Sequence, residues 1–311
     1  MLGPSPDSGK DYVSMRYDTI KWELVSSPQC PGDNAIGILT LDVPERMNAI
    51  SPRMALELDR IVDDIRESGA RVVILTGAGG NFSGGGDLKV ETVPLERPEE
   101  THGLEGAYMD LVMWWMNDHH HVVAQQVCRK WEDLPMPTIA AIDGVCVGMG
   151  FEFTLCCDLR IVSDRAKLSE IAVPAGFMSE WASPRVLPKI IGYARAAEMI
   201  LTGRFVLGEE AYRIGLANKV VPADDLMDTT MTWAGRIASY PSRGLKFAKE
   251  TLRLYRNKDR NLDDMKLETD RVLELSRTQA CAEGLSAFLE KRPPVYHQDN
   301  PVEYPRPDET W

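Results

Sequence analysis

The sequence predicts an α/β protein, with a core of mainly parallel strands alternating with helices, followed by a helical C-terminal part. Short apolar, β-branched runs alternate with helical patterns in the first part of the chain, which is typical of stacked β-α units. Two glycine-rich segments follow such runs, as expected where backbone must turn sharply. After about residue 182 the pattern becomes almost wholly helical.

Four strands are expected in the core. Each is a short apolar run, and they cover residues 35–41, 71–76, 138–142 and 159–162. The helix between the first two strands should begin at Ser51, because a serine N-cap followed by Pro52 at the first helical position is a start signal. Apolar residues then recur at helical spacing until Gly69, where we expect the helix to end.

The helical part is predicted from apolar residues at helical spacing, in segments 194–201, 209–214, 226–238, 242–254 and 263–289. We therefore divide the chain into a loose leader, an α/β core, a helical part and an extended tail, at 1–16, 17–200, 201–292 and 293–311. The tail is rich in proline, a composition that favours extended chain over a packed core.

Composition argues against several classes of protein. The 311 residues are 44% hydrophobic and 26% charged, which is ordinary for a globular chain. A net charge of −12 argues against nucleic-acid binding, which needs clustered Lys and Arg. No apolar run approaches a membrane span, and the start lacks a signal-peptide pattern. We therefore expect a cytoplasmic protein without nucleic-acid or membrane partners.

Neither the six cysteines nor the histidine run carries a metal signature. The cysteines form no C-x-x-C pair, and we expect free thiols in a reducing compartment. His119, His120 and His121 are adjacent, and adjacent side chains on a helix point in different directions, so we expect no metal site. Around them, residues 94–135 are rich in Met and Trp, which fits either a packed helix or the lining of an apolar pocket.

Two glycine-rich segments stand out as chemically informative. They are residues 77–89 (GAGGNFSGGGDLK) and 143–158 (DGVCVGMGFEFTLCCD). Neither is a P-loop or a convincing dinucleotide fingerprint, and each alone could be a tight turn. Together, one backbone N–H from each loop could converge and form an oxyanion hole for a developing enolate. The helix that the second loop opens would add the positive end of its dipole.

Several motifs follow one another along the chain: P-E-R-M-N-A-I, G-x-G-x-x-F-S-G-G-G-D-L, P-T-I-A-A-I-D-G-x-x-x-G-x-G-x-E-x-x-x-x-C-D, LTGRFVLGEEAYRIGLANKVVP and AFLEKRPP. In this order and spacing, from about residue 17 to 296, the sequence resembles the enoyl-CoA hydratase/isomerase (crotonase) superfamily. The resemblance implies a ββα spiral core with a helical C-terminal trimerisation region. It also implies homotrimers, often paired into hexamers, and an acyl-CoA thioester substrate that brings coenzyme A, with no tightly bound cofactor.

The resemblance places the oxyanion donors on the backbone N–H groups of Gly86 and Met149. Met149 stands where the family usually has glycine, so its side chain must point away from the hole, and we expect a narrower pocket. Glu152 falls on the first of two hydratase glutamates. Its own position, a carboxylate at an apolar helix start near the second loop, suits acid–base work, although a carboxylate that only binds helix amides is the alternative.

The second hydratase glutamate should lie four residues before Gly176, where this sequence has Ala172. Glu170 lies two residues upstream, and Glu180 lies in the segment that replaces the family's glycine-rich turn; either could be the second catalytic acid or a surface or helix-capping carboxylate. The residues placed for CoA recognition, which could equally be solvated surface, are Arg46, Asp87, Lys89 and Lys291.

Three functions stay open at this point. The first is a hydratase or isomerase that adds water to, or shifts, the α,β double bond of an acyl-CoA. The second is a C–C bond hydrolase of the same superfamily, acting on a cyclic β-diketone or a ring acyl-CoA. The third is a non-catalytic scaffold with this fold. Retention of Glu152 and of both glycine-rich loops argues against the third.

Overall fold

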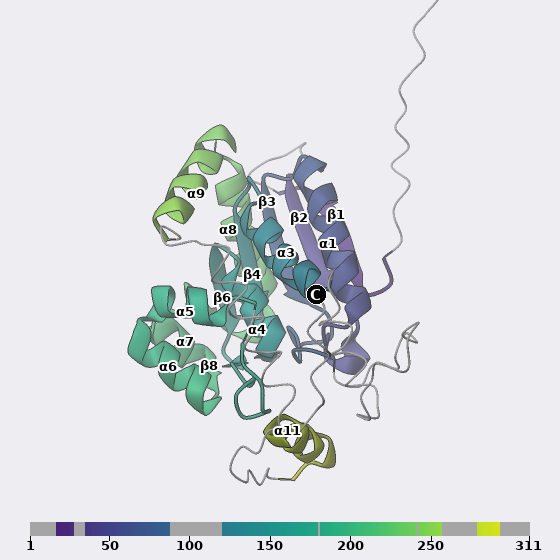
Figure 1. Cartoon of the computed structure of the whole chain (residues 1–311). Coiled ribbons are helices and arrows are strands. Elements are labelled where there is room, and N and C mark those ends of the chain that lie inside the picture. Colours follow the sequence, from purple (N-terminus) through teal and green to yellow (C-terminus); the bar gives the residue numbers. More distant parts are fainter. Residues whose placement is uncertain are drawn as a thin grey trace, which may run out of the picture.

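The computed structural model describes residues 17–27, 35–87, 120–179, 181–240, 242–256 and 279–292. Its centre is a six-stranded sheet in the order β1-β2-β3-β4-β6-β9 (Figure 1). The strands of this sheet are β1 (Ile20–Val25), β2 (Ile36–Leu41), β3 (Val72–Gly77), β4 (Thr138–Ile142), β6 (Leu159–Ser163) and β9 (Lys219–Val221). Only β1 and β2 pair antiparallel, and the other four pairings are parallel.

A second, three-stranded sheet lies at the carboxyl ends of the large one. It consists of β5 (Val145–Val147), β7 (Lys167–Ser169) and β8 (Val206–Leu207). Strand β5 begins three residues after β4 ends, and β7 begins four residues after β6 ends. The chain therefore turns from the large sheet into the small one twice, and both turns deliver residues to the same region.

The helices are α1 (Pro52–Glu67), α3 (His120–Glu132), α4 (Gly148–Leu155), α5 (Ser183–Ile191), α6 (Tyr193–Thr202), α7 (Gly208–Arg213), α8 (Leu226–Ala238), α9 (Ser242–Arg256) and α11 (Gln279–Glu290). Two short 3₁₀ helices cover Pro44–Arg46 and Ala223–Asp225. In Figure 1, α1 and α3 lie in front of the large sheet and α8 lies behind it.

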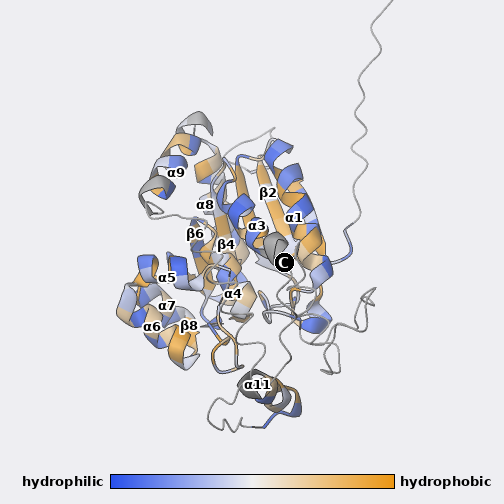
Figure 2. Ribbon diagram, viewed as in Figure 1, coloured by the Kyte–Doolittle hydropathy of each residue, from blue (hydrophilic) through white to orange (hydrophobic). Residues whose placement is uncertain are grey.

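The two faces of the large sheet bury two separate cores, because successive strand residues point to opposite sides. On β3, Val73 and Leu75 face the larger core with α1 and α3, while Val72 and Ile74 face the smaller core with α8. Figure 2 shows the strands as continuous apolar ribbons between these helices. A parallel sheet covered on both faces is expected to show such runs.

Most of the predicted elements are confirmed. Ser51 accepts a hydrogen bond from the Met54 N–H, as an N-cap should. The prediction that the chain beyond residue 182 is almost wholly helical was incomplete, because β9 adds the last strand to the large sheet. The leader, the tail and residues 88–119 and 257–278 lie outside the described residues, and so does most of the Met- and Trp-rich region.

Among the described residues, no helix has the length and apolar character needed to cross a membrane. The same part of the chain holds no cluster of three potential metal-binding side chains. The four cysteines whose side chains are described, Cys128, Cys146, Cys156 and Cys157, are buried free thiols. His119 lies outside the described residues, and of His120 and His121 only the backbone is described, as the start of α3.

Candidate active site

The two glycine-rich loops lie against each other. The Ser83 N–H donates to the Val145 carbonyl at 3.0 Å, and the Val147 N–H donates to the Ser83 carbonyl at 3.1 Å, so Ser83 forms a parallel bridge with β5. Gly150 packs directly on Ser83: a Cβ on Gly150 would lie 2.3 Å from the Ser83 Cβ. Only glycine allows this approach, and it brings the start of α4 onto the first loop.

Gly86 and Met149 are placed to act as a pair of backbone donors. The bridge between Gly86 and Ile50 uses the Gly85 carbonyl and the Asp87 N–H, so the Gly86 N–H points away from that ladder. Met149 is the second residue of α4, and its N–H therefore has no acceptor within the helix. The positive end of the α4 dipole lies at the same point.

The Met149 side chain reaches the first loop. A Cβ built on Gly86 would lie 2.9 Å from the Met149 Sδ, so the thioether packs over the Gly86 Cα. Met149 is half-buried and also packs against the larger core. The two donor residues are thus in contact through this side chain, which occupies space that glycine at position 149 would leave open.

Glu152 lies one turn further along α4 than Met149, on the same side of the helix. Its side chain is buried, with 2% of the residue exposed. The Oε2 atom accepts hydrogen bonds from the Trp181 N–H at 2.5 Å and from the Ala182 N–H at 3.1 Å. These two amides directly precede α5, so the first turn of that helix fixes the Glu152 carboxyl group.

Glu170 follows β7 and is equally buried, with 1% exposed. Its Oε2 accepts a hydrogen bond from the Ser183 Oγ at 2.7 Å, and its Oε1 accepts one from the Ala172 N–H at 3.4 Å. Ala172 is the position at which the sequence resemblance placed a second glutamate. The carboxyl group of Glu170 thus folds back towards the backbone of Ala172, the position at which a glutamate was expected.

The two carboxyl groups form a pair. Burial raises the pKa of Glu170, while hydrogen bonds from Ser183 and with Glu152 oppose that rise. A carboxyl group with a raised pKa keeps its proton to higher pH than an ordinary glutamate, so Glu170 is suited to act as an acid beside Glu152. A base and an acid side by side are what a two-proton-transfer reaction needs.

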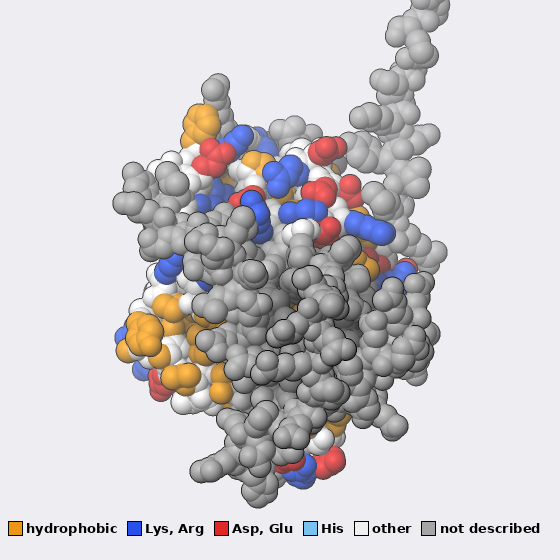
Figure 3. All heavy atoms as spheres, in the orientation of Figure 1, with side chains coloured by type: hydrophobic (Ala, Val, Ile, Leu, Met, Phe, Trp, Pro, Cys, Tyr) orange, Lys and Arg blue, Asp and Glu red, His pale blue; other side chains and the backbone are white. Residues whose placement is uncertain are grey.

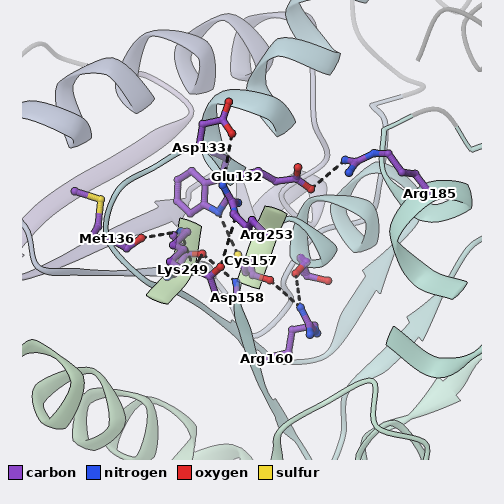
Figure 4. Close-up of polar contacts among 12 residues, drawn as sticks. Glu132, Asp133, Met136, Cys157, Asp158, Arg160, Arg185, Lys249 and Arg253 are labelled. Carbon is purple, nitrogen blue, oxygen red and sulfur yellow. Dashed lines mark hydrogen bonds and ion pairs between the residues drawn. The ribbon is translucent and has the colours of Figure 1, made fainter. Parts of the chain in front are cut away.

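Ion pairs and hydrogen bonds of buried side chains connect the elements near these acids (Figure 4). Glu132 at the end of α3 is fully buried and pairs with Arg185 of α5 at 3.0 Å. Arg160 closes the C-terminal end of α4 by donating to the Thr154 and Cys157 carbonyls. Lys249 of α9 donates to the Met136 carbonyl and pairs with Asp158, both at 2.7 Å. The C-terminal ends of α3 and α4 are therefore tied to neighbouring elements.

The residues suggested for CoA recognition fall in different places. Asp87 is buried and pairs with Arg46 at 2.6 Å, so its carboxylate orients Arg46 beside the first loop. Lys291 is exposed at the end of α11, and no contact joins it to the other suggested residues in the described part of the chain. Lys89 and Glu180 lie outside the described residues.

Sequence reasoning missed the part played by the start of α5. The amides of Trp181 and Ala182 and the hydroxyl of Ser183 hold the two acids, but no motif marks them. The one available signal was the Ser183-Pro184 pair, a pattern typical of a helix start. It indicates where α5 begins, and it does not indicate what that end of the helix faces.

Comparisons with known proteins identify relatives of this chain. The family model described as enoyl-CoA hydratase/isomerase matches residues 32–299. The (E)-benzylidenesuccinyl-CoA hydratase of Thauera aromatica is 32% identical, over 85% of this chain and 96% of that protein. The short-chain-enoyl-CoA hydratase of Clostridium acetobutylicum is 28% identical, over 84% of this chain and 93% of that protein.

A solved structure supports the fold independently. The crystal structure of an enoyl-CoA hydratase from Mycobacterium avium subsp. paratuberculosis covers 91% of this chain and 100% of its own, with a TM-score of 0.75 and 20% identity. At that identity the likeness shows the fold alone. The family match over most of the chain, and the relative that is 32% identical over 85% of it, show that this chain belongs to the enoyl-CoA hydratase/isomerase family.

Proposed function

We propose that this enzyme adds water across the α,β double bond of an acyl-CoA thioester. The observation that carries the proposal is the buried pair of Glu152 and Glu170. Glu152 lies one turn along α4 from the proposed backbone donor Met149. Hydration needs one group that takes a proton from water and another that gives a proton to Cα. The pair supplies both within one hydrogen-bonded unit.

The thioester carbonyl would bind between the two loops. Its oxygen would accept hydrogen bonds from the Gly86 and Met149 N–H groups, and these bonds strengthen as negative charge develops on that oxygen in the enolate. Removing a single donor of this kind typically lowers kcat by about a hundredfold to a thousandfold. Because the donors are backbone groups, the Met149 side chain does not remove one of them.

Glu170 takes the place of the second glutamate in this proposal. Its Oε1 accepts from the backbone N–H of Ala172, the position of the expected glutamate, and its carboxyl group contacts Glu152. A local displacement by two residues along the chain is therefore offset by the way the side chain folds back. Glu180 stays a candidate that the described residues do not place.

The remaining features of the proposal concern binding of the CoA part of the substrate and the oligomeric state. Arg46 and Lys291 would contact the CoA phosphates, and no tightly bound cofactor is needed for this chemistry. We also propose a cytoplasmic homotrimer, or a hexamer of two trimers. Figure 3 shows an apolar patch over α6, β8 and the segment between them, where the large side chains of Leu201, Phe205 and Leu207 are exposed. Burying them in an assembly would remove apolar surface from water.

The test is mass spectrometry of products formed in ¹⁸O-labelled water. The substrate panel contains straight-chain, aromatic and alicyclic enoyl-CoA thioesters together with free cyclic β-diketones. Addition of one labelled oxygen to an intact CoA thioester supports the proposal. Double-bond migration without label identifies an isomerase, and a labelled carboxylate from an opened ring identifies a C–C bond hydrolase; either result overturns hydration.

A further inference from the structure

Ser183 makes a contact that the helix around it does not require. It is the first residue of α5 and is fully buried. The N-cap position belongs to Ala182, and no side chain caps this helix end. The Ser183 hydroxyl instead donates to the Glu170 Oε2 at 2.7 Å. Its hydrogen bond therefore serves the acid and not the helix start.

The same helix turn contacts both acids through different groups. Backbone amides of Trp181 and Ala182 hold the Glu152 Oε2, and the Ser183 side chain holds the Glu170 Oε2. The amides cannot be removed by substitution without changing the backbone, but the hydroxyl can. The Ala172 N–H contacts the other oxygen, Oε1, at 3.4 Å, and Glu152 and Ser179 also form hydrogen bonds with the Glu170 carboxyl group.

We propose that Ser183 is a positioning residue for Glu170, fixing the rotation of its carboxyl group and directing its transferable proton to the Oε1 atom. This inference rests on the proposed function, because it gives Glu170 a part in hydration. Ser183 itself would touch neither the substrate nor the reacting atoms. Its effect should pass entirely through Glu170.

The expected effect has a defined direction. A donor to a carboxylate stabilises the charged form, and the Ser183 hydrogen bond opposes the rise that burial causes in the pKa of Glu170. Within the described residues, the titratable groups that interact with Glu170 are Glu152 of α4 and Cys146 of β5. Removing the hydroxyl should therefore raise the pKa of Glu170 further.

The experiment compares Ser183→Ala and Ser183→Thr with the wild-type chain. In Ser183→Ala we expect kcat to fall about tenfold, the scale of one lost hydrogen bond, with KM little changed and the Glu170-dependent limb of the kcat–pH profile shifted to higher pH. Ser183→Thr keeps a hydroxyl and should restore most of kcat and the original limb. A fall in kcat without a shift of the limb would mean a merely structural role.

Two further measurements keep the proposal testable if a variant is unstable or if hydration is not found. Adding Ser183→Ala to Glu170→Gln should cause no further loss of kcat, because the residue acts through Glu170. A ¹³C-carboxyl NMR titration of Glu170 needs no substrate, and it should show the higher pKa in Ser183→Ala. An unshifted titration overturns the positioning role even if water addition is observed, whereas a shift in an enzyme that adds no water overturns only the function.

Discussion

Glu152 and Glu170 follow two different strands of the small sheet, and their carboxyl groups meet at the first turn of α5. Glu152 reaches this point from α4, which follows β5, and Glu170 reaches it from the segment after β7. Because β5 and β7 are parallel neighbours, the residues that follow them emerge side by side. The small sheet thus explains why acids separated by 18 positions in the sequence form a pair.

Replacing Glu152 with Gln should remove catalysis while leaving the fold intact. The amide keeps the shape of the side chain and an oxygen for the Trp181 and Ala182 N–H groups, but it cannot exchange a proton. We expect kcat to fall by at least about a hundredfold, the scale of a positioned acid or base. Steady-state hydration assays and a thermal-unfolding control check this, and persistent turnover would show that Glu152 only binds helix amides.

The separate roles of the two acids can be tested by measuring exchange of the substrate's α-proton with solvent. The group that gives a proton to Cα should also catalyse α-proton exchange of a saturated acyl-CoA in D₂O. We expect one of Glu152→Gln and Glu170→Gln to abolish this exchange and the other to retain it while losing water addition. Proton NMR of the thioester measures it, and equal loss in both variants would contradict separate roles.

Glu170 should make the free energy of unfolding depend on pH. Burial raises its pKa above the ordinary 4.5, so the folded state binds its proton more tightly than the unfolded state. The contribution of Glu170 to the free energy of unfolding is therefore fully present below its pKa in the unfolded state, and it is lost as the pH rises through its pKa in the folded state. Urea unfolding from about pH 4 to about pH 8 should show a smaller decline in Glu170→Gln than in wild type; parallel curves would contradict this.

Sequence patterns predicted the four central strands of the large sheet, β2, β3, β4 and β6, but neither its outer strands β1 and β9 nor the small sheet. Strands β2 and β4 have six and five residues, most of them apolar, which is enough for a pattern to emerge. Strands β5, β7, β8 and β9 have only two or three residues, too few for any periodicity. Their pairing depends on tertiary contacts, which is why the sheet that positions the acids was not predicted.

The candidate site was also predictable only in part. Gly86, Met149 and Glu152 lie in motifs of fixed spacing, so their proximity followed from the two loops. The position of Glu170 depends on how its side chain folds over Ala172 and on how α5 docks. Neither of these leaves a periodic signal, so the sequence left the choice between Glu170 and Glu180 open.

Breaking the buried pair of Glu132 and Arg185 should destabilise the protein strongly. Arg185→Met leaves the Glu132 carboxylate fully buried without its nearest cation, which typically costs about 3–5 kcal/mol of unfolding free energy. The double variant Glu132→Leu/Arg185→Met removes both charges and should recover most of that loss. Urea unfolding measures all three; a double variant no better than the single one would mean that the pair is not the cause.

Gly150→Ala should separate the two loops, and Gly244→Ala provides its matched control. A Cβ at position 150 would lie 2.3 Å from the Ser83 Cβ and 2.5 Å from its Oγ, and Ser83 is held by backbone hydrogen bonds on both sides, so the start of α4 must move. We expect a loss of about 1–3 kcal/mol of unfolding free energy, as for other overpacked sites. Because the Met149 N–H moves with α4, kcat should fall as well.

Gly244 lies inside α9, where an added Cβ meets no atom within 4 Å. The same substitution there should stabilise the helix by about 0.5–1 kcal/mol and leave hydration unchanged. The contrast between the two variants separates the general effect of alanine on the backbone from the specific contact with Ser83. If Gly150→Ala retained both wild-type stability and wild-type kcat, the close approach of the loops would not be what forms the oxyanion hole.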